Sequence, residues 1–248
     1  MKYYYLTDDS EKSLAPFFSK TVLSACFIGV VVISILLIIC WPRQPLSGFI
    51  VKNKIPLVFF MTFSATLIVN SYINLCCGCG ELIRRGFHVI KYRTDRSTYE
   101  KENDFLKYGL IEFLLHSSIL LLLCLPHLIL AASISAISFI LFLMAVSILY
   151  SASLLCRMFG FMVYLFWGRT STIGYFVART FMIVFIFGTF FFASFLNPLH
   201  ILYLLNENTS AIGLPFVFYM MTLIFTILLL IGANHFLVRR HINKEKTT

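Results

Sequence analysis

One apolar stretch constrains this chain more than any other. Residues Leu110–Leu130 read LIEFLLHSSILLLLCLPHLIL, and a helix rising about 1.5 Å per residue crosses a hydrocarbon layer of about 30 Å in about 20 residues. The stretch therefore predicts a membrane span. It also carries polar side chains, namely Glu112, His116, Ser117, Ser118 and His127. Because charged groups in a span are costly to insert, they usually face the bundle interior, where functional sites form.

The rest of the chain has the composition of a membrane protein. Of its 248 residues, 59% are hydrophobic and only 12% are charged, whereas soluble domains have about a quarter charged residues. The pattern predicts an all-α, polytopic helical bundle with about six transmembrane helices, and these leave no room for a separate soluble domain. The predicted spans are about 20–41, 55–75, 110–130, 133–155, 175–196 and 214–237.

These spans divide the chain into a short N-terminal tail at 1–19, a membrane domain at 20–238 and a C-terminal tail at 239–248. Ala131–Ser133 is predicted to form a tight hairpin between the third and fourth spans. Cys156–Trp167 is apolar but too short to cross, so it reads as an interfacial connection or an extension of the fourth span. Gly80–Lys107 is a polar loop whose first half has the pattern of an amphipathic helix on an anionic surface.

Lys and Arg are distributed unequally between the two predicted sides of the membrane. The two tails, the loop after the second span, Arg157 and Arg169 together place sixteen on one side, against Arg43, Lys52 and Lys54 on the other. The positive-inside rule then predicts that both termini are cytosolic. The net charge of +9 is explained by this orientation. A nucleic-acid partner is not expected, because the basic residues form no stripe interleaved with aromatics.

Two short patterns indicate the compartment. Lys244 and Lys246 stand fifth and third from the end of the chain, as in the dilysine signal that the coat of Golgi-to-ER vesicles reads on cytosolic tails. The alternative is a basic helix end with two lysines by chance. Asn208-Thr209-Ser210 is a glycosylation sequon in the predicted lumenal loop before the last span. The chain is therefore predicted to reside in the endoplasmic reticulum membrane, with vesicle coat as a partner of its tail.

Three of the seven cysteines are packed together as Cys76, Cys77 and Cys79. At a cytosolic helix end this pattern favours S-palmitoylation, and the alternative is free thiols buried at the end of a span. No second Cys or His pair lies at zinc-ligand spacing in the adjoining loop. We therefore expect no metal site and no cofactor.

Glu112 and His116 are the main candidates for chemistry, because they lie one helical turn apart on one face. A general base, a proton relay and half of a metal site would share this pattern. The alternatives are a Glu112 carboxylate that reaches the nearby interface and a His116 that bonds a neighbouring helix. His116 is the only catalytic candidate, since the sequence has no Ser/His/Asp set, phosphate-binding Gly loop or HExxH motif.

Other polar residues near span ends suit lipid headgroups or helix contacts. Arg179 is close enough to the cytosolic face to reach lipid phosphates. Asn234 and His235 can bind a headgroup or cap the last span, and His127 is expected at the lumenal interface. Asn70 and Asn74, one turn apart on the second span, can bond another helix.

The order of several motifs resembles the TLC-domain family, the multi-span ER proteins that include the ceramide synthases. The resemblance covers about 72–240. It rests on a span beginning EFLLHS at Glu112, where the family often has paired histidines. It also rests on the fourth span ending YSASLLCR at Arg157, and on Asn234-His235-Phe236 in the last span, where the family often has Asn followed by aromatics.

This chain departs from the synthases of that family. Ser117 replaces the second histidine, Tyr150 stands where the family has an acidic residue, and the paired aspartates have no counterpart. The resemblance therefore implies a non-synthase member with a lipid-accessible cavity. Together with the position of Arg179 near the headgroups, this makes the lipid-binding candidates Glu112, His116, Ser117, Arg157, Arg179 and Asn234.

The expected function is to bind or regulate membrane lipid without catalysis. Two alternatives stay open, a ceramide-synthase-like acyltransferase with His116 as base and an accessory subunit with membrane-protein partners. A transporter is less expected, because no Gly/Pro-broken pair of spans is visible.

Overall fold

The computed structural model describes residues 57–79, 110–167, 172–206 and 212–246, together with isolated helical positions at 28, 31, 32 and 35. Apart from those four positions, the N-terminal tail, the first predicted span and the polar loop after the second span lie outside the described residues. Within the described ranges every regular element is a helix and no strand occurs. The predicted all-α class is confirmed.

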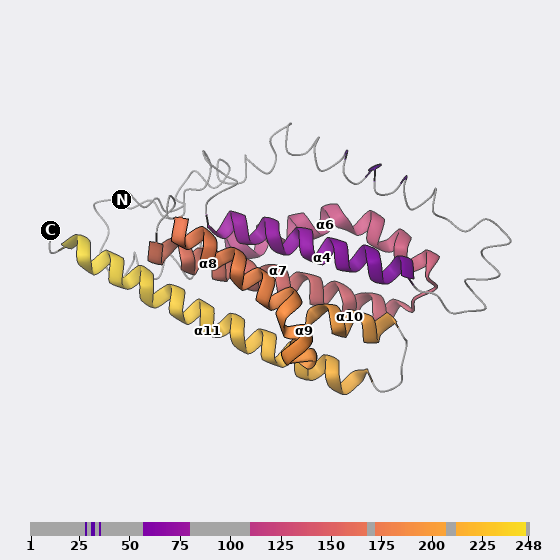
Figure 1. Ribbon diagram of the computed structural model, residues 1–248. Coiled ribbons are helices and arrows are strands. Elements are labelled where there is room, and N and C mark those ends of the chain that lie inside the picture. The colour runs from indigo at the N-terminus through magenta and orange to yellow at the C-terminus, as the bar shows by residue number, and fades with distance from the viewer. Residues whose placement is uncertain are drawn as a thin grey trace.

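Four helices in the described ranges are long and apolar enough to cross a membrane: α4 (Leu57–Gly78), α6 (Leu110–Ile134), α7 (Phe139–Trp167) and α11 (Gly213–Lys246). They run alongside one another as an elongated bundle (Figure 1). The chain is therefore a membrane protein built as a helical bundle. Helix α11 continues past the predicted sixth span, so the backbone of the C-terminal tail is helical as far as Lys246.

The turn between α6 and α7 lies later than the sequence pattern predicts. Ala131–Ser133 belongs to α6, since alanine and serine can continue a helix, and the chain turns over residues 135–138. Ala136 takes up a positive φ of 50° there. Ser138 then begins the next helix by accepting a hydrogen bond at its Oγ from the Leu141 N–H, at 3.4 Å.

Helix α7 runs without interruption from Phe139 to Trp167, so Cys156–Trp167 extends the fourth span. It contains no proline, and its 29 residues give a length of about 43 Å. This length places Arg157 inside the helix and not in a loop, which corrects the charge count. Without Arg157, fifteen basic residues remain on the predicted cytosolic side.

The fifth predicted span is not one helix. It divides into α8 (Thr172–Ile183), a π-helical turn η2 (Val184–Gly188), α9 (Thr189–Phe192), a 3₁₀ turn η3 (Ser194–Leu196) and α10 (Pro198–Asn206). The helical backbone is nonetheless continuous from Thr172 to Phe192 and is interrupted at Ala193, near the end of the predicted span at 175–196. Pro198 has no N–H to continue the preceding helix, but it suits the first turn of a new one.

Asn197 holds this break together. Its Nδ2 donates hydrogen bonds to the Ile186 carbonyl and to Thr189 Oγ1, both at 2.8 Å, and its Oδ1 accepts one from the His200 N–H at 2.9 Å. The side chain is fully buried. One amide therefore satisfies a carbonyl at the π turn and caps α10, as a broken helix in an apolar environment requires.

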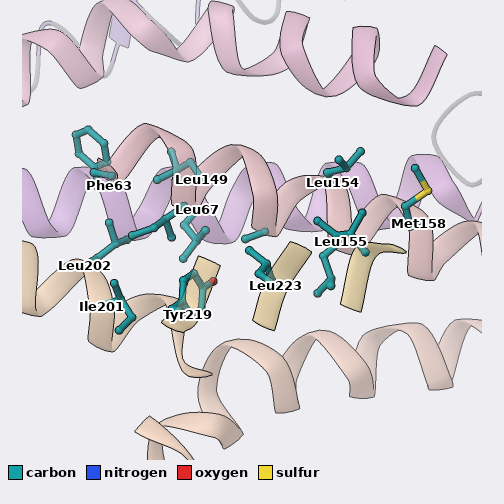
Figure 2. Close-up of a cluster of buried hydrophobic side chains, with 14 of the residues drawn as sticks. Phe63, Leu67, Leu149, Leu154, Leu155, Met158, Ile201, Leu202, Tyr219 and Leu223 are labelled. Atoms are coloured by element: carbon teal, nitrogen blue, oxygen red, sulfur yellow. The ribbon is translucent and has the colours of Figure 1, made fainter. Parts of the chain in front are cut away.

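Helix α7 lies at the centre of the bundle and contacts α4, α6, α8, α10 and α11. Figure 2 shows a core in which α4, α7, α10 and α11 each contribute apolar side chains, among them Phe63, Leu149, Leu202 and Leu223. Helices α4 and α7 run in the same direction, because Phe63 meets Phe142 near their starts and Gly78 meets Gly160 near their ends.

The two glycines allow the backbones of α4 and α7 to touch. A Cβ placed on Gly78 would lie 2.9 Å from Phe161 N and 3.0 Å from Gly160 Cα. Small residues are the usual means by which membrane helices approach this closely. The contact sets α4 directly against the segment of α7 that carries Arg157.

Candidate functional site

Arg157 and His116 form a buried polar pair between α7 and α6. Arg157 is fully buried and His116 nearly so, and Arg157 Nη2 lies 2.7 Å from His116 Nδ1. A guanidinium can only donate hydrogen bonds, so Nδ1 must be the acceptor. An imidazole that accepts at Nδ1 carries its proton on Nε2. In this arrangement neither nitrogen of His116 offers a lone pair for use as a general base.

Two further groups surround the guanidinium. The Arg157 Cζ atom lies 5.1 Å from the centre of the Phe113 ring, a cation–π arrangement. The Cys77 thiol at the end of α4 is close enough to the same guanidinium to interact with its charge. The site therefore joins α4, α6 and α7. We call Cys77, Phe113, His116 and Arg157 the arginine site.

A line of polar contacts joins α4 to α6 beside this site. Ser117 Oγ donates to Asn74 Oδ1 at 2.9 Å, and Asn74 Nδ2 donates to the Asn70 carbonyl at 2.9 Å. Cys124 Sγ donates to Asn70 Oδ1 at 3.9 Å. The prediction that Asn70 and Asn74 bond another helix is confirmed.

His127 ends this line and is buried between α6 and α4, while its place at the lumenal interface stays a prediction. Its exposed fraction is 2%, and its Nε2 lies 3.1 Å from Thr66 Oγ1 on α4. The sequence around His127 gave no signal that Thr66, on another helix, would form a hydrogen bond with it. We call the contacts from Thr66–His127 to Asn74–Ser117 the polar seam.

Asn234 joins the last helix to the arginine site through the backbone. Its Nδ2 donates to the carbonyl of Met158, the residue after Arg157, at 3.0 Å, and the side chain is fully buried. Arg179 is not part of this site. It lies on the exposed side of α8, with its guanidinium 5.6 Å from the Tyr175 ring centre.

Tyr150, which stands in place of an acidic residue of the resembled family, bridges α7 and α6. Its hydroxyl donates to the Leu114 carbonyl at 3.5 Å and lies 3.4 Å from Ser118 Oγ. The tyrosine therefore serves as a contact between helices at this position.

The remaining candidates are placed as follows. Cys76, Cys77 and Cys79 form no disulfide and are buried, which matches the alternative of thiols buried at the end of a span, while palmitoylation stays a prediction. The side chain of Glu112 lies outside the described part of the chain, as do Asn208 and the side chains of Lys244 and Lys246. In the ranges that the structure describes, no three His, Cys, Asp or Glu side chains come together as metal ligands.

Sequence reasoning missed Phe113 and the two contact glycines, and it gave no place beside Arg157 to Cys77. A phenylalanine in an apolar helix carries no signal that it will lie against an arginine. Helices α4 and α7 each contain a single glycine, and its meaning depends on which helices become neighbours. The arginine site presents hydrogen-bond donors and a positive charge, so it complements an acceptor such as a lipid phosphate or carbonyl.

Comparisons of the chain with protein-family models, with curated proteins and with solved structures gave no match.

Proposed function

We propose that this protein is a non-catalytic, multi-span protein of the endoplasmic reticulum membrane that binds or regulates membrane lipid. We further propose that it is a non-synthase relative of the TLC-domain proteins. The observation that carries the proposal is the fully buried Arg157, 2.7 Å from His116, within a helix long and apolar enough to span the membrane. Ionisable groups so placed are functional candidates by default.

The chemistry of the arginine site supports a binding role over a catalytic one. Arg157 donates to His116 Nδ1, so the pair contributes charge and donors and no base. A polar lipid group supplies the acceptors that such a pair complements. Ser117 and Asn234 hold α4 and α11 beside the pair, so their part in lipid binding is to fix the walls of the site.

The test is native mass spectrometry and lipid extraction of the purified protein. We expect one lipid class to co-purify with the wild type in stoichiometric amount and to be lost from His116→Ala. Arg157→Lys, which keeps the charge without the planar donor fork, should retain part of it. Arg179→Gln is the matched control, since it removes an arginine from the exposed side of α8. Identical bulk lipid in all four proteins would reject the proposal.

The enzyme alternative has its own test. Lipid profiling of cells that carry His116→Ala should give an unchanged sphingolipid and phospholipid composition at normal protein level. A specific product lost in the variant, with normal folding, would favour an acyltransferase instead.

Residence in the endoplasmic reticulum and cytosolic termini belong to the same proposal, supported by Lys244, Lys246 and the distribution of basic residues. Replacing both lysines by serine should move the protein to later compartments and abolish binding of the tail to vesicle coat. Retention in the endoplasmic reticulum after this change would reject the dilysine interpretation.

An accessory subunit of a larger membrane complex is the second candidate. It is favoured by α11, of whose membrane-crossing window only 17% is buried inside the protein, against 56% for α7. Native-size analysis in mild detergent tests this candidate, because a stable protein partner should co-purify with the chain and increase its apparent size. A monomer that carries only lipid would exclude this candidate.

A further inference from the structure

The imidazole of His127 has one nitrogen whose role is fixed and one that is not used. Thr66 Oγ1 donates its own proton to the Thr62 carbonyl at 2.8 Å. The hydroxyl therefore has no proton to give to His127, and the 3.1 Å contact must be donated by His127 Nε2. The tautomer follows from this: Nδ1 carries the lone pair and is an acceptor.

Nδ1 of His127 is buried and has no hydrogen-bond partner among the described residues. A buried acceptor is stabilised only when a donor reaches it. Side chains in the polar seam do not supply one, because Ser117 and Cys124 donate to Asn74 and Asn70. The position therefore calls for a donor that the described chain does not contain.

The surroundings indicate which donor fits. Leu128 and Ala131, which follow His127 on α6, are fully buried, and so is Phe63, about one turn from Thr66 on α4. A hydroxyl attached to an apolar body matches an acceptor in apolar surroundings, and a water molecule is the competing donor. No charged side chain is described in this stretch of α6, so the ligand class is uncharged.

The bilayer lies next to this position. Pro126 and Ile129, on either side of the histidine in α6, face outward. Pro126 also has no N–H for the carbonyl one turn earlier, so one backbone hydrogen bond of α6 is missing beside His127. The missing hydrogen bond and the two outward-facing residues therefore place the outer surface of α6 beside the residue whose acceptor is unused.

We propose that His127 forms a second lipid site, in which Nδ1 accepts a hydrogen bond from the free hydroxyl of an uncharged lipid. This site is distinct from the arginine site. His116 and His127 are separated by about 16 Å along the axis of α6, so the two sites lie toward opposite ends of the polar seam.

The probe is a photoreactive diacylglycerol with a free hydroxyl, incorporated in nanodiscs with the full-length protein, and its methyl ether is the matched control lipid. We expect the wild type to be labelled on α6 about tenfold more by the alcohol than by the ether, as the loss of one buried hydrogen bond implies. Equal labelling by the two probes would overturn the proposal, and would assign the donor at Nδ1 to water.

Two substitutions separate binding from folding. In H127N the side-chain amide can place an acceptor near the position of Nδ1, whereas in H127Q it can place a donor near Nε2 and keep the Thr66 contact. We expect H127N to retain the preference for the alcohol and H127Q to lose it while remaining folded. The reverse order, with H127Q retaining the preference, would overturn the assignment of Nδ1. H116A, which alters the arginine site, should leave the labelling beside His127 unchanged. The proposal for His127 can therefore be rejected while the proposal for the arginine site stands, and the reverse is also possible.

Discussion

Replacing Gly160 by alanine tests the close contact between α4 and α7. An alanine Cβ there would overlap the Leu75 carbonyl and lie 3.1 Å from both Cys79 N and Gly78 Cα. All three neighbours are backbone atoms, which cannot rotate away as a side chain can. Helices α4 and α7 must therefore move apart by some tenths of an ångström along this contact. Overpacking of this kind costs about 1–3 kcal/mol of the free energy of unfolding.

The assay measures the reactivity of cysteine thiols that are buried while α4 and α7 stay in contact. Cys77 and Cys79 are almost completely buried, so a maleimide dye reports when α4 leaves α7 during a thermal ramp in detergent. Gly160→Ala should react at a lower temperature than the wild type. Gly232→Ala is the matched control, because a Cβ there has no neighbour within 4 Å and alanine is the better helix former by about 1 kcal/mol.

Equal melting of the two alanine variants would refute the reasoning, because it would mean that the α4–α7 contact is not close in the membrane. The double variant Gly78→Ala/Gly160→Ala adds a second condition. Both glycines occupy one contact, so once the helices have separated, the second Cβ costs less than the first. Strictly additive effects would show two independent sites and would contradict the shared contact.

Three further changes test other parts of the fold. Asn197→Leu should lower the free energy of unfolding by about 2–4 kcal/mol, because it removes the α10 cap and leaves the Ile186 carbonyl without a donor. Asn197→Asp keeps the cap but loses the Nδ2 donor. Thermal unfolding compares the two variants with the wild type, and equal stability of Asn197→Asp and the wild type would contradict the role of Nδ2. Ala136→Gly should stabilise the protein by about 1 kcal/mol, because φ is 50° there, and a lower melting temperature would count against the turn. A double-mutant cycle on Ser117 and Asn74 should give a coupling of about 0.5–1.5 kcal/mol, and zero coupling would mean that the 2.9 Å bond contributes nothing.

The positions of four long membrane helices were predictable because hydrophobicity is a property of the local sequence. A run of about 20 apolar residues in a bilayer has to form a helix, because its backbone N–H and C=O groups find hydrogen-bond partners only within the segment. The same local reasoning did not foresee the interruption at Ala193, which the side chain of Asn197 stabilises. At 175–196 the composition is that of one span, yet Asn197 satisfies the backbone of a broken one.

The candidate site was predicted in two of its four members, His116 and Arg157, but not in its geometry. His116 and Arg157 were recognised separately, one as an intramembrane candidate and the other as a loop residue. Their contact depends on α7 continuing past Cys156 and on α6 packing antiparallel to α4, with Thr66 at His127 and Asn74 at Ser117.

The sequence by itself determined the class of the protein, its long helices and the residue types that are costly to bury. The tertiary structure alone decided which of those residues meet. Spacing within one helix determines which side chains share a face, but the partner of a face depends on helix packing. In this protein that packing depends on Gly78 and Gly160, whose missing side chains let two backbones touch and bring Cys77 to Arg157.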